Sequence, residues 1–381
     1  MDVLWVLLGV AVILVGLMDM FVAVLHYDAV SFLTPAMYRW TWVVTRTLTR
    51  ALPSRLAGGL RALAAPWMVV LTLGIWLGTQ ALGFALVYYP GVTANGLVVG
   101  ASLRRSFAAA LVVSSATLAS LSFSDLAPRS MTYHAVAAAE TLVGLAIITV
   151  TISYILNVYQ VIQAQHSLAS ALHHQAEDGG DPRSILAPHF VDGRPEGLST
   201  HLREFHRGLV EQGEGMRRYP IVFYFQSRQT YRSIPYVFHM IGGVVAALRW
   251  GLPMNHPATV DPWLPSLATG YRSVMREVEH NFVPRVGPTE PVPVPLDRFR
   301  AALVDEACSD GDERLVEFVK LGRFMGGIAD LRDPPDPEEA YRRYCEWLPF
   351  ATESAAFVSA LAADLGIDIG HIVAEPDTAR F

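Results

Sequence analysis

Three long apolar segments dominate the first half of the chain, and each has the length of a membrane-spanning helix. The first, residues 3–25, reads VLWVLLGVAVILVGLMDMFVAVL; the second covers residues 66–89 and the third residues 131–162. A helix of about 20 residues crosses the hydrocarbon core of a bilayer, which is about 30 Å thick. The pattern predicts three transmembrane helices, with Pro66 in the first turn of the second. The third continues into water as a helix to about residue 177.

The first segment also occupies the position of a secretory signal peptide, so this alternative needs a test. A signal peptide begins with positive charge and has an apolar run of about 7 to 15 residues. Here the run is longer, and Asp2 precedes it without any Lys or Arg. We therefore expect residues 1–30 to form a retained N-terminal transmembrane helix.

Arginines predict the orientation of these helices. Residues 31–65 carry five arginines interleaved with apolar side chains, namely Arg39, Arg46, Arg50, Arg55 and Arg61. This mixture predicts an amphipathic segment on the membrane surface, and basic segments of this kind stay in the cytoplasm. We expect a multi-pass protein of the bacterial inner (plasma) membrane, with the N-terminus outside and the C-terminal domain cytoplasmic. This orientation also places three arginines outside, which counts against it: Arg104, Arg105 and Arg129.

The connection between the second and third segments contains an apolar stretch that is too short to cross a bilayer. Residues 103–118 read LRRSFAAALVVSSATL, and SLSFSD follows at 120–125. Irregular backbone at membrane depth is tolerated only where it is buried in protein or lines a water-filled cavity. A short helix with a polar returning strand suits an ion pathway. We therefore predict a re-entrant pore helix that contains Ser114, Ser115 and Thr117, followed by a filter.

The order of these segments resembles the tetrameric pore-loop ion channels, particularly the bacterial potassium-channel-like proteins with an additional N-terminal transmembrane helix. The family's T-x-x-T-V-G-Y-G-D motif aligns with residues 117–125, and Pro128 stands at the usual place of the exit proline. The resemblance covers residues 1–178 and implies a pore domain at 66–162 and a homotetramer that passes monovalent ions through the bilayer. It implies a selectivity filter made of Ser120, Leu121, Ser122, Phe123, Ser124 and Asp125.

The filter departs from that family at both glycines, because Ser122 and Ser124 take their places. A left-handed backbone costs a residue other than glycine about 1 to 2 kcal/mol. Eight such positions in a tetramer would cost about 8 to 16 kcal/mol, which is comparable with the stability of a whole domain. We expect a channel without strong potassium selectivity, with cation permeation or weak selectivity favoured. The alternatives are an anion-permeable channel, since serine hydroxyls also donate to anions, and a non-conducting membrane sensor or scaffold.

The third apolar segment has a mostly polar face at four-residue spacing. Its members are Thr141, Leu145, Thr149, Ser153 and Asn157. We predict that Thr141, Thr149, Ser153 and Asn157 line the pore; hydroxyls bonded to their own helix are the alternative. The resemblance also implies a gating hinge at Gly144, where a packing contact is the alternative.

Two acidic residues lie inside the predicted transmembrane helices, Asp19 and Glu140. Intramembrane carboxylates are functional candidates because their burial in a bilayer is costly. For Glu140 we expect a partner among Ser114, Ser115 and Thr117. For Asp19 we expect His26 or an arginine of residues 31–65.

The second half of the chain has a different composition. The first 162 residues contain 8 basic and 5 acidic side chains, whereas the remaining 219 contain 21 and 30. We predict a helical cytosolic domain at 163–283, a proline-rich linker at 284–297 and a C-terminal helical subdomain at 298–381. The net negative charge excludes a nucleic-acid surface.

The sequence RRYPIVFYFQSR at 217–228 is expected to pack against the membrane-proximal helices. The predicted helices of this half cover about 197–215, 229–249, 261–283, 297–308, 312–330 and 337–364.

Enzymatic chemistry is not indicated by the residue pattern. No nucleophile, base and orienting group recur at a recognisable spacing, so we do not expect an enzyme. Cys308 and Cys345 lack the spacing of a metal or redox site, and no cofactor is expected. The predicted fold is an all-α membrane protein with three transmembrane helices, a re-entrant pore helix and filter, and a helical cytosolic domain.

Overall fold

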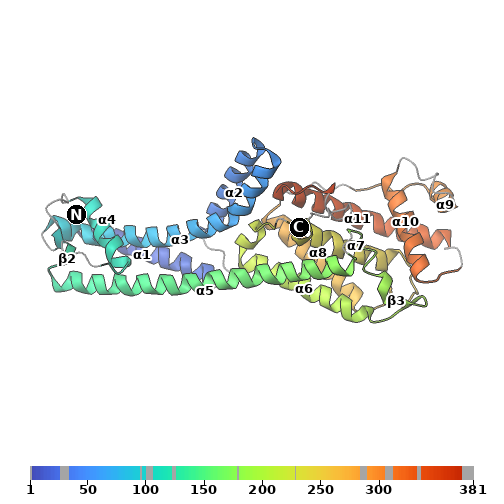
Figure 1. Ribbon diagram of the computed structural model, residues 1–381, viewed down its shortest axis with the longest axis horizontal. Helices are drawn as coiled ribbons and strands as arrows, with labels where there is room; N and C mark the ends of the chain where they lie inside the picture. The colour runs from blue at the N-terminus through green and yellow to red at the C-terminus, as the bar shows by residue number, and fades with distance from the viewer. Residues whose placement is uncertain are drawn as a thin grey trace. The chain divides into compact units, whose positions relative to one another are not determined.

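The protein divides into two compact units. The first contains Met1–Gln160 and Arg218–Gln226, and the second contains Val161–Arg217 and Ser227–Phe381. Most of the chain is helical, with two pairs of very short strands (Figure 1). The computed structural model describes residues 2–25, 34–94, 97–99, 106–121, 126–177, 180–227, 229–283, 290–304, 312–332 and 336–370.

Three helices are long and apolar enough to cross a membrane, as the sequence predicts. They are α1 (Asp2–Leu25), α3 (Ser54–Thr93) and α5 (Met131–Gln175). Many of their large apolar side chains are exposed, including Leu142 at 68% and Leu4 at 66%. Exposed apolar surface of this extent is suited to lipid rather than water. The chain is therefore a membrane protein with three candidate membrane-spanning helices.

Glycines allow α1 and α3 to pack closely. A Cβ atom on Gly9 would lie 2.6 Å from the carbonyl oxygen of Gly83, and one on Gly16 would lie 2.5 Å from Nε2 of Gln80. Small residues bring helix backbones together where lipid provides no hydrophobic driving force. Nearer the start of α1, Trp5 packs edge-to-face on Tyr89 at 5.4 Å. Because Gly9 meets Gly83 and Gly16 meets Gln80, the two helices run antiparallel.

The start of α3 corrects one prediction. The helix begins at Ser54, so Pro66 lies inside it rather than in its first turn. Residues 54–65 are rich in Ala, Leu and Arg, which are strong helix formers. Their propensity extends the helix through Pro66, which lacks the N–H that would pair with the carbonyl of Ala62.

A short aromatic segment from later in the chain packs on the first unit. The 3-10 helix η2 (Pro220–Tyr224) contacts α2 (Thr34–Arg50) and α3. The Tyr224 ring lies 5.3 Å from the ring of Trp42 on α2, and Tyr219 lies 5.8 Å from Tyr154 on α5. The predicted packing of this segment against the membrane-proximal helices is confirmed.

The second unit is a helical domain around α7 (Ile234–Trp250), which is buried along most of its length. α8 (Trp263–Asn281) and α11 (Pro337–Leu365) pack against it. All six helices predicted for this half are present, and α5 ends at Gln175, close to the predicted residue. The other elements are η1 (Ala187–His189), β3 (Phe190–Val191), β4 (Arg194–Pro195), α6 (Leu198–Arg218), η3 (Thr230–Arg232), α9 (Leu296–Val304) and α10 (Glu313–Ile328).

Side-chain caps explain several helix boundaries of this domain. Asp312 accepts hydrogen bonds from the backbone N–H groups of Arg314 and Leu315 at the start of α10. Asp336 caps α11 in the same way through Glu338. Such caps satisfy donors that have no partner within the helix. The proline-rich linker lies partly outside the described residues, at 284–289.

Candidate functional site

A short helix, α4 (Phe107–Leu118), lies between α3 and α5 in the chain and packs on both. Its 12 residues extend about 18 Å, less than the roughly 30 Å of a bilayer core. The strand before it, β1 (Leu97–Val99), pairs antiparallel with the strand after it, β2 (Leu126–Pro128). The register joins Leu97 to Pro128 and Val99 to Leu126, so the chain enters and leaves this segment at one place (Figure 1).

Small side chains allow α4 to pack closely against α3. Ala109 and Ala110 are fully buried, and they pack with Phe84, Ala85 and Tyr88 of α3. Alanine brings the two backbones close and costs no side-chain entropy on burial. The same core includes Leu97 of β1, so the helix and the strand pair belong to one packed cluster.

Glu140 joins the three helices around this cluster. Its side chain is 0% exposed and accepts a hydrogen bond from the Tyr88 hydroxyl of α3, with an O–O distance of 2.7 Å. The Ser114 hydroxyl of α4 lies 2.5 Å from the other carboxyl oxygen. Contact between Glu140 and Ser114 is one of the pairings expected from the sequence, whereas the partner Tyr88 was not anticipated.

The number of hydrogens in this cluster indicates how it is bonded. Ser114 Oγ lies 2.9 Å from the carbonyl oxygen of Ala81 as well as 2.5 Å from Glu140. A serine hydroxyl has one hydrogen, so it cannot donate to both acceptors. All three contacts are satisfied when Glu140 carries a proton, since it then donates to Ser114, Ser114 donates to Ala81, and Tyr88 donates to Glu140.

The C-terminal end of α4 is closed by a Schellman-type turn. The Leu121 N–H donates to the carbonyl of Ala116 at 2.8 Å, and the Ser120 N–H donates to that of Thr117 at 2.9 Å. Ser120 has a left-handed backbone with φ of 56°, the conformation that this turn requires and that glycine adopts most easily. The first residue of the predicted filter is thus already in a left-handed conformation.

Gly144 lies against this end of α4. A Cβ atom at Gly144 would clash with the carbonyl oxygen of Leu118. One turn earlier, the Thr141 hydroxyl lies 3.5 Å from the Thr117 carbonyl and 2.9 Å from that of Ala137. The packing contact considered for Gly144 is therefore present, and its role as a hinge stays a prediction. Since Gly144 is 13 residues after Met131, the end of α4 lies about 20 Å along α5.

The remaining residues of the predicted pore helix and filter fall into two groups, those that the structure describes and those that it does not. Ser115 and Leu121 are exposed, and the half-buried Thr117 donates its hydroxyl hydrogen to the Val113 carbonyl at 2.9 Å. The other four filter residues lie outside the described residues: Ser122, Phe123, Ser124 and Asp125.

The predicted polar face of α5 is only partly exposed. Thr149 and Ser153 are exposed, and each donates its hydroxyl hydrogen to the carbonyl four residues earlier, at 3.0 Å and 3.1 Å. The alternative of bonding to the same helix is thus observed for both. Asn157 and Thr141 are half-buried, and Leu145 is exposed at 52%. Thr149 and Ser153 lie on the opposite side of α5 from Glu140, because they follow it by 9 and 13 residues at 100° each.

Asp19 belongs to a second buried polar cluster in the first unit. Its carboxylate accepts hydrogen bonds from the Thr34 hydroxyl at 3.1 Å and from Trp76 Nε1 at 3.2 Å. Its expected partner His26 lies outside the described residues. Nearby, the hydroxyls of Tyr38 and Tyr154 lie 2.9 Å apart, and Trp76 packs edge-to-face on Tyr154 at 5.6 Å. Sequence reasoning missed both tyrosines, since nothing in their local pattern indicates a partner more than 100 residues away.

Metal chemistry has no visible basis in the part of the chain that the structure describes. No group of three or more His, Cys, Asp or Glu side chains there is arranged to hold a metal ion. Cys345 is a free thiol, and Cys308 falls in a range that the structure does not describe.

The comparisons with known proteins do not add a function. No family model, no curated protein and no solved structure matches this chain. The geometry around α4 is therefore the basis for a functional proposal.

Proposed function

We propose that four copies of this chain form a pore-loop ion channel in which residues 120–125 are the filter and α4 is the pore helix. The observation that carries this proposal is the pairing of β1 with β2 around a helix that ends against Gly144. A segment that enters and leaves at one place, and whose helix ends about 20 Å along α5, is re-entrant if α5 crosses the bilayer.

The direction of α4 favours cations at the filter. A helix carries partial negative charge at its C-terminal end, where the last carbonyls lack partners within the helix. In α4 that end leads directly into Ser120. The proposed Asp125 ring at the outer mouth acts in the same direction. We therefore favour passive, weakly selective permeation of monovalent cations over permeation of anions.

We infer assembly of several copies because one copy is incomplete, and we take the number four from the resemblance to tetrameric channels. A single α4 and a single polar α5 face cannot enclose an ion pathway, and the exposed side of α5 carries both Thr149 and large apolar residues. In the proposed tetramer, Thr149 and Ser153 lie toward the pore and the apolar residues beside them meet neighbouring subunits or lipid. The N-terminus is then outside, and the second unit lies in the cytoplasm beneath a bacterial inner membrane.

Ion flux measures the proposed activity directly. Purified protein is reconstituted into liposomes under opposed K⁺, Na⁺ and Cl⁻ gradients, and the reversal potential is recorded. A reversal potential near the cation equilibrium values supports the proposal, and one near the chloride value supports the anion channel. The absence of flux in every gradient contradicts channel activity and favours a non-conducting sensor or scaffold.

Two double variants test whether residues 120–125 form the filter. Ser122→Gly with Ser124→Gly restores the conformational freedom of the family's glycines, so we expect a gain in potassium selectivity. Ser122→Ala with Ser124→Ala is the matched control, because it removes the same hydroxyls without providing that freedom. Unchanged permeation in the glycine variant would locate the pathway elsewhere. A monomer by native mass measurement would also contradict the proposal.

A further inference from the structure

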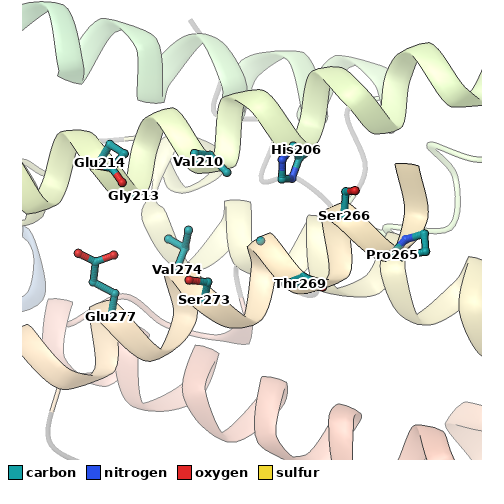
Figure 2. A pocket seen from close by; sticks show the side chains of 11 residues that line it. His206, Val210, Gly213, Glu214, Pro265, Ser266, Thr269, Ser273, Val274 and Glu277 are labelled. Carbon is teal, nitrogen blue, oxygen red and sulfur yellow. The ribbon is translucent and has the colours of Figure 1, made fainter. Parts of the chain in front are cut away.

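A groove lies in the second unit between α6 and α8. Its volume is about 530 Å³, within the range of about 300 to 1,000 Å³ that is typical of small-molecule sites. Figure 2 shows the lining side chains projecting from the two helices toward each other. The polar ones are His206 and Glu214 from α6 and Ser266, Thr269, Ser273 and Glu277 from α8.

Two glycines account for the shape of the groove. A Cβ atom on Gly213 of α6 would lie 2.9 Å from a methyl group of Val274, and one on Gly270 of α8 would lie 3.0 Å from His206 Nδ1. Both glycines and Val274 are buried, so these contacts form the floor. The longer side chains beside them are half-buried or exposed and form the walls.

One end of the groove is acidic. Arg217 lies 3.7 Å from Glu214 and 3.7 Å from Glu277, so two carboxylates share one guanidinium. The three side chains together carry a net charge of about −1. Both distances are longer than a charge-assisted hydrogen bond of about 2.7 to 2.9 Å.

The other end of the groove provides a buried acceptor. His206 Nδ1 is buried and has no hydrogen-bond partner among the residues that the structure describes. The hydroxyls of Ser266, Thr269 and Ser273 also line the groove. Carboxylates, hydroxyl oxygens and an imidazole nitrogen can all accept hydrogen bonds, so the groove suits a ligand rich in N–H donors. Such an unsatisfied buried nitrogen calls for a partner.

We propose that this groove binds a linear organic polyamine, with one ammonium group between Glu214 and Glu277 and a second amine at His206. Glu214 follows His206 by eight residues on α6, which corresponds to about 12 Å. The proposal is independent of channel activity, and its failure would leave the pore assignment unchanged.

Calorimetric titration of the full chain with spermidine in a neutral detergent tests the proposal. We expect one ligand per chain and an affinity that falls as salt is added, because the ion pairs are partly exposed. Glu214→Gln with Glu277→Gln should weaken binding by about tenfold or more, since charge-assisted hydrogen bonds are lost. Glu211→Gln with Glu279→Gln is the matched control: it removes the same charge from the same two helices outside the groove and should leave affinity unchanged.

Two results would overturn the proposal. Equal weakening in the two double variants would mean that spermidine binds the acidic domain without using the groove. The absence of heat at millimolar spermidine, together with groove-dependent binding of a basic peptide, would replace the small ligand with a protein partner.

Discussion

Replacing Glu140 tests the network that joins α4 to its neighbours and the protonation inferred from it. In Glu140→Gln, the amide donates to Ser114 and the amide oxygen accepts from Tyr88, so the bonding of a protonated carboxyl is reproduced. In Glu140→Ala, the Tyr88 hydroxyl loses the carboxyl oxygen that it contacts at 2.7 Å. The two variants therefore separate the shape of the network from its charge.

The expected losses follow from burial. Leaving a buried polar group without its partner costs about 1 to 3 kcal/mol. Two hydroxyls lose a partner in Glu140→Ala, and Ser114 keeps Ala81, so we expect a loss of about 2 to 4 kcal/mol in the free energy of unfolding. For Glu140→Gln we expect a change within about 1 kcal/mol.

Thermal unfolding of the full chain in detergent, followed by tryptophan fluorescence, measures these losses. For a unit of about 150 to 250 residues, 1 kcal/mol shifts Tm by about 2 to 4 °C, so Glu140→Ala should lower Tm by roughly 5 to 15 °C. Glu140→Gln should change it by less than about 4 °C. Glu211→Ala, at an exposed position on α6, is the control and should leave Tm unchanged. An equal loss in the Gln and Ala variants would refute the protonated carboxyl and require an ionised one.

Three further substitutions test local features of the fold. Ser120→Gly should raise stability by about 1 kcal/mol, because the left-handed turn then carries no Cβ; the control Ser115→Gly, within α4, should lower it by about as much. Gly144→Ala should lower stability by about 1 to 3 kcal/mol through its clash with α4, and unchanged Tm and conductance would contradict this contact. Burial lowers the pKa of His256, whose Nδ1 accepts the Ala258 N–H at 3.2 Å. The neutral ring is therefore the folded form, and its stability contribution is complete above about pH 6.5 and decreases as pH falls below that value. His256→Asn, which keeps an acceptor but does not titrate, should flatten the dependence of Tm on pH between 5 and 7; an unchanged slope would assign the dependence to other groups.

Local sequence patterns predicted the helices well. Apolar length alone identified α1, α3 and α5, and helical segments separated by prolines after residue 162 identified the helices of the second unit. The same local reasoning misplaced the start of α3, because Pro66 is a strong signal for a first turn. The helix formers before it outweigh that signal, and the helix continues through Pro66 without the hydrogen bond that its missing N–H would make.

Contacts between distant residues were predicted only where burial demanded a partner. A carboxyl group inside a bilayer needs a hydrogen-bond partner, and for Glu140 this requirement predicted a partner on α4. No comparable requirement predicted Tyr88 as a partner of Glu140, because a tyrosine hydroxyl finds hydrogen-bond partners in many environments. The groove between α6 and α8 was also missed. Gly213 and Gly270 resemble any other helical glycine until their neighbours across the groove are known.

The pairing of β1 with β2 also bears on the order in which we expect the first unit to fold. α3 and α5 are long enough to enter a bilayer independently, whereas α4 is not. Strands of three residues are not stable alone, so β1 and β2 pair only after α3 and α5 have brought their ends together. We therefore expect α4 to dock after α3 and α5 have inserted, so defects at the Glu140 cluster should slow maturation of an already inserted chain.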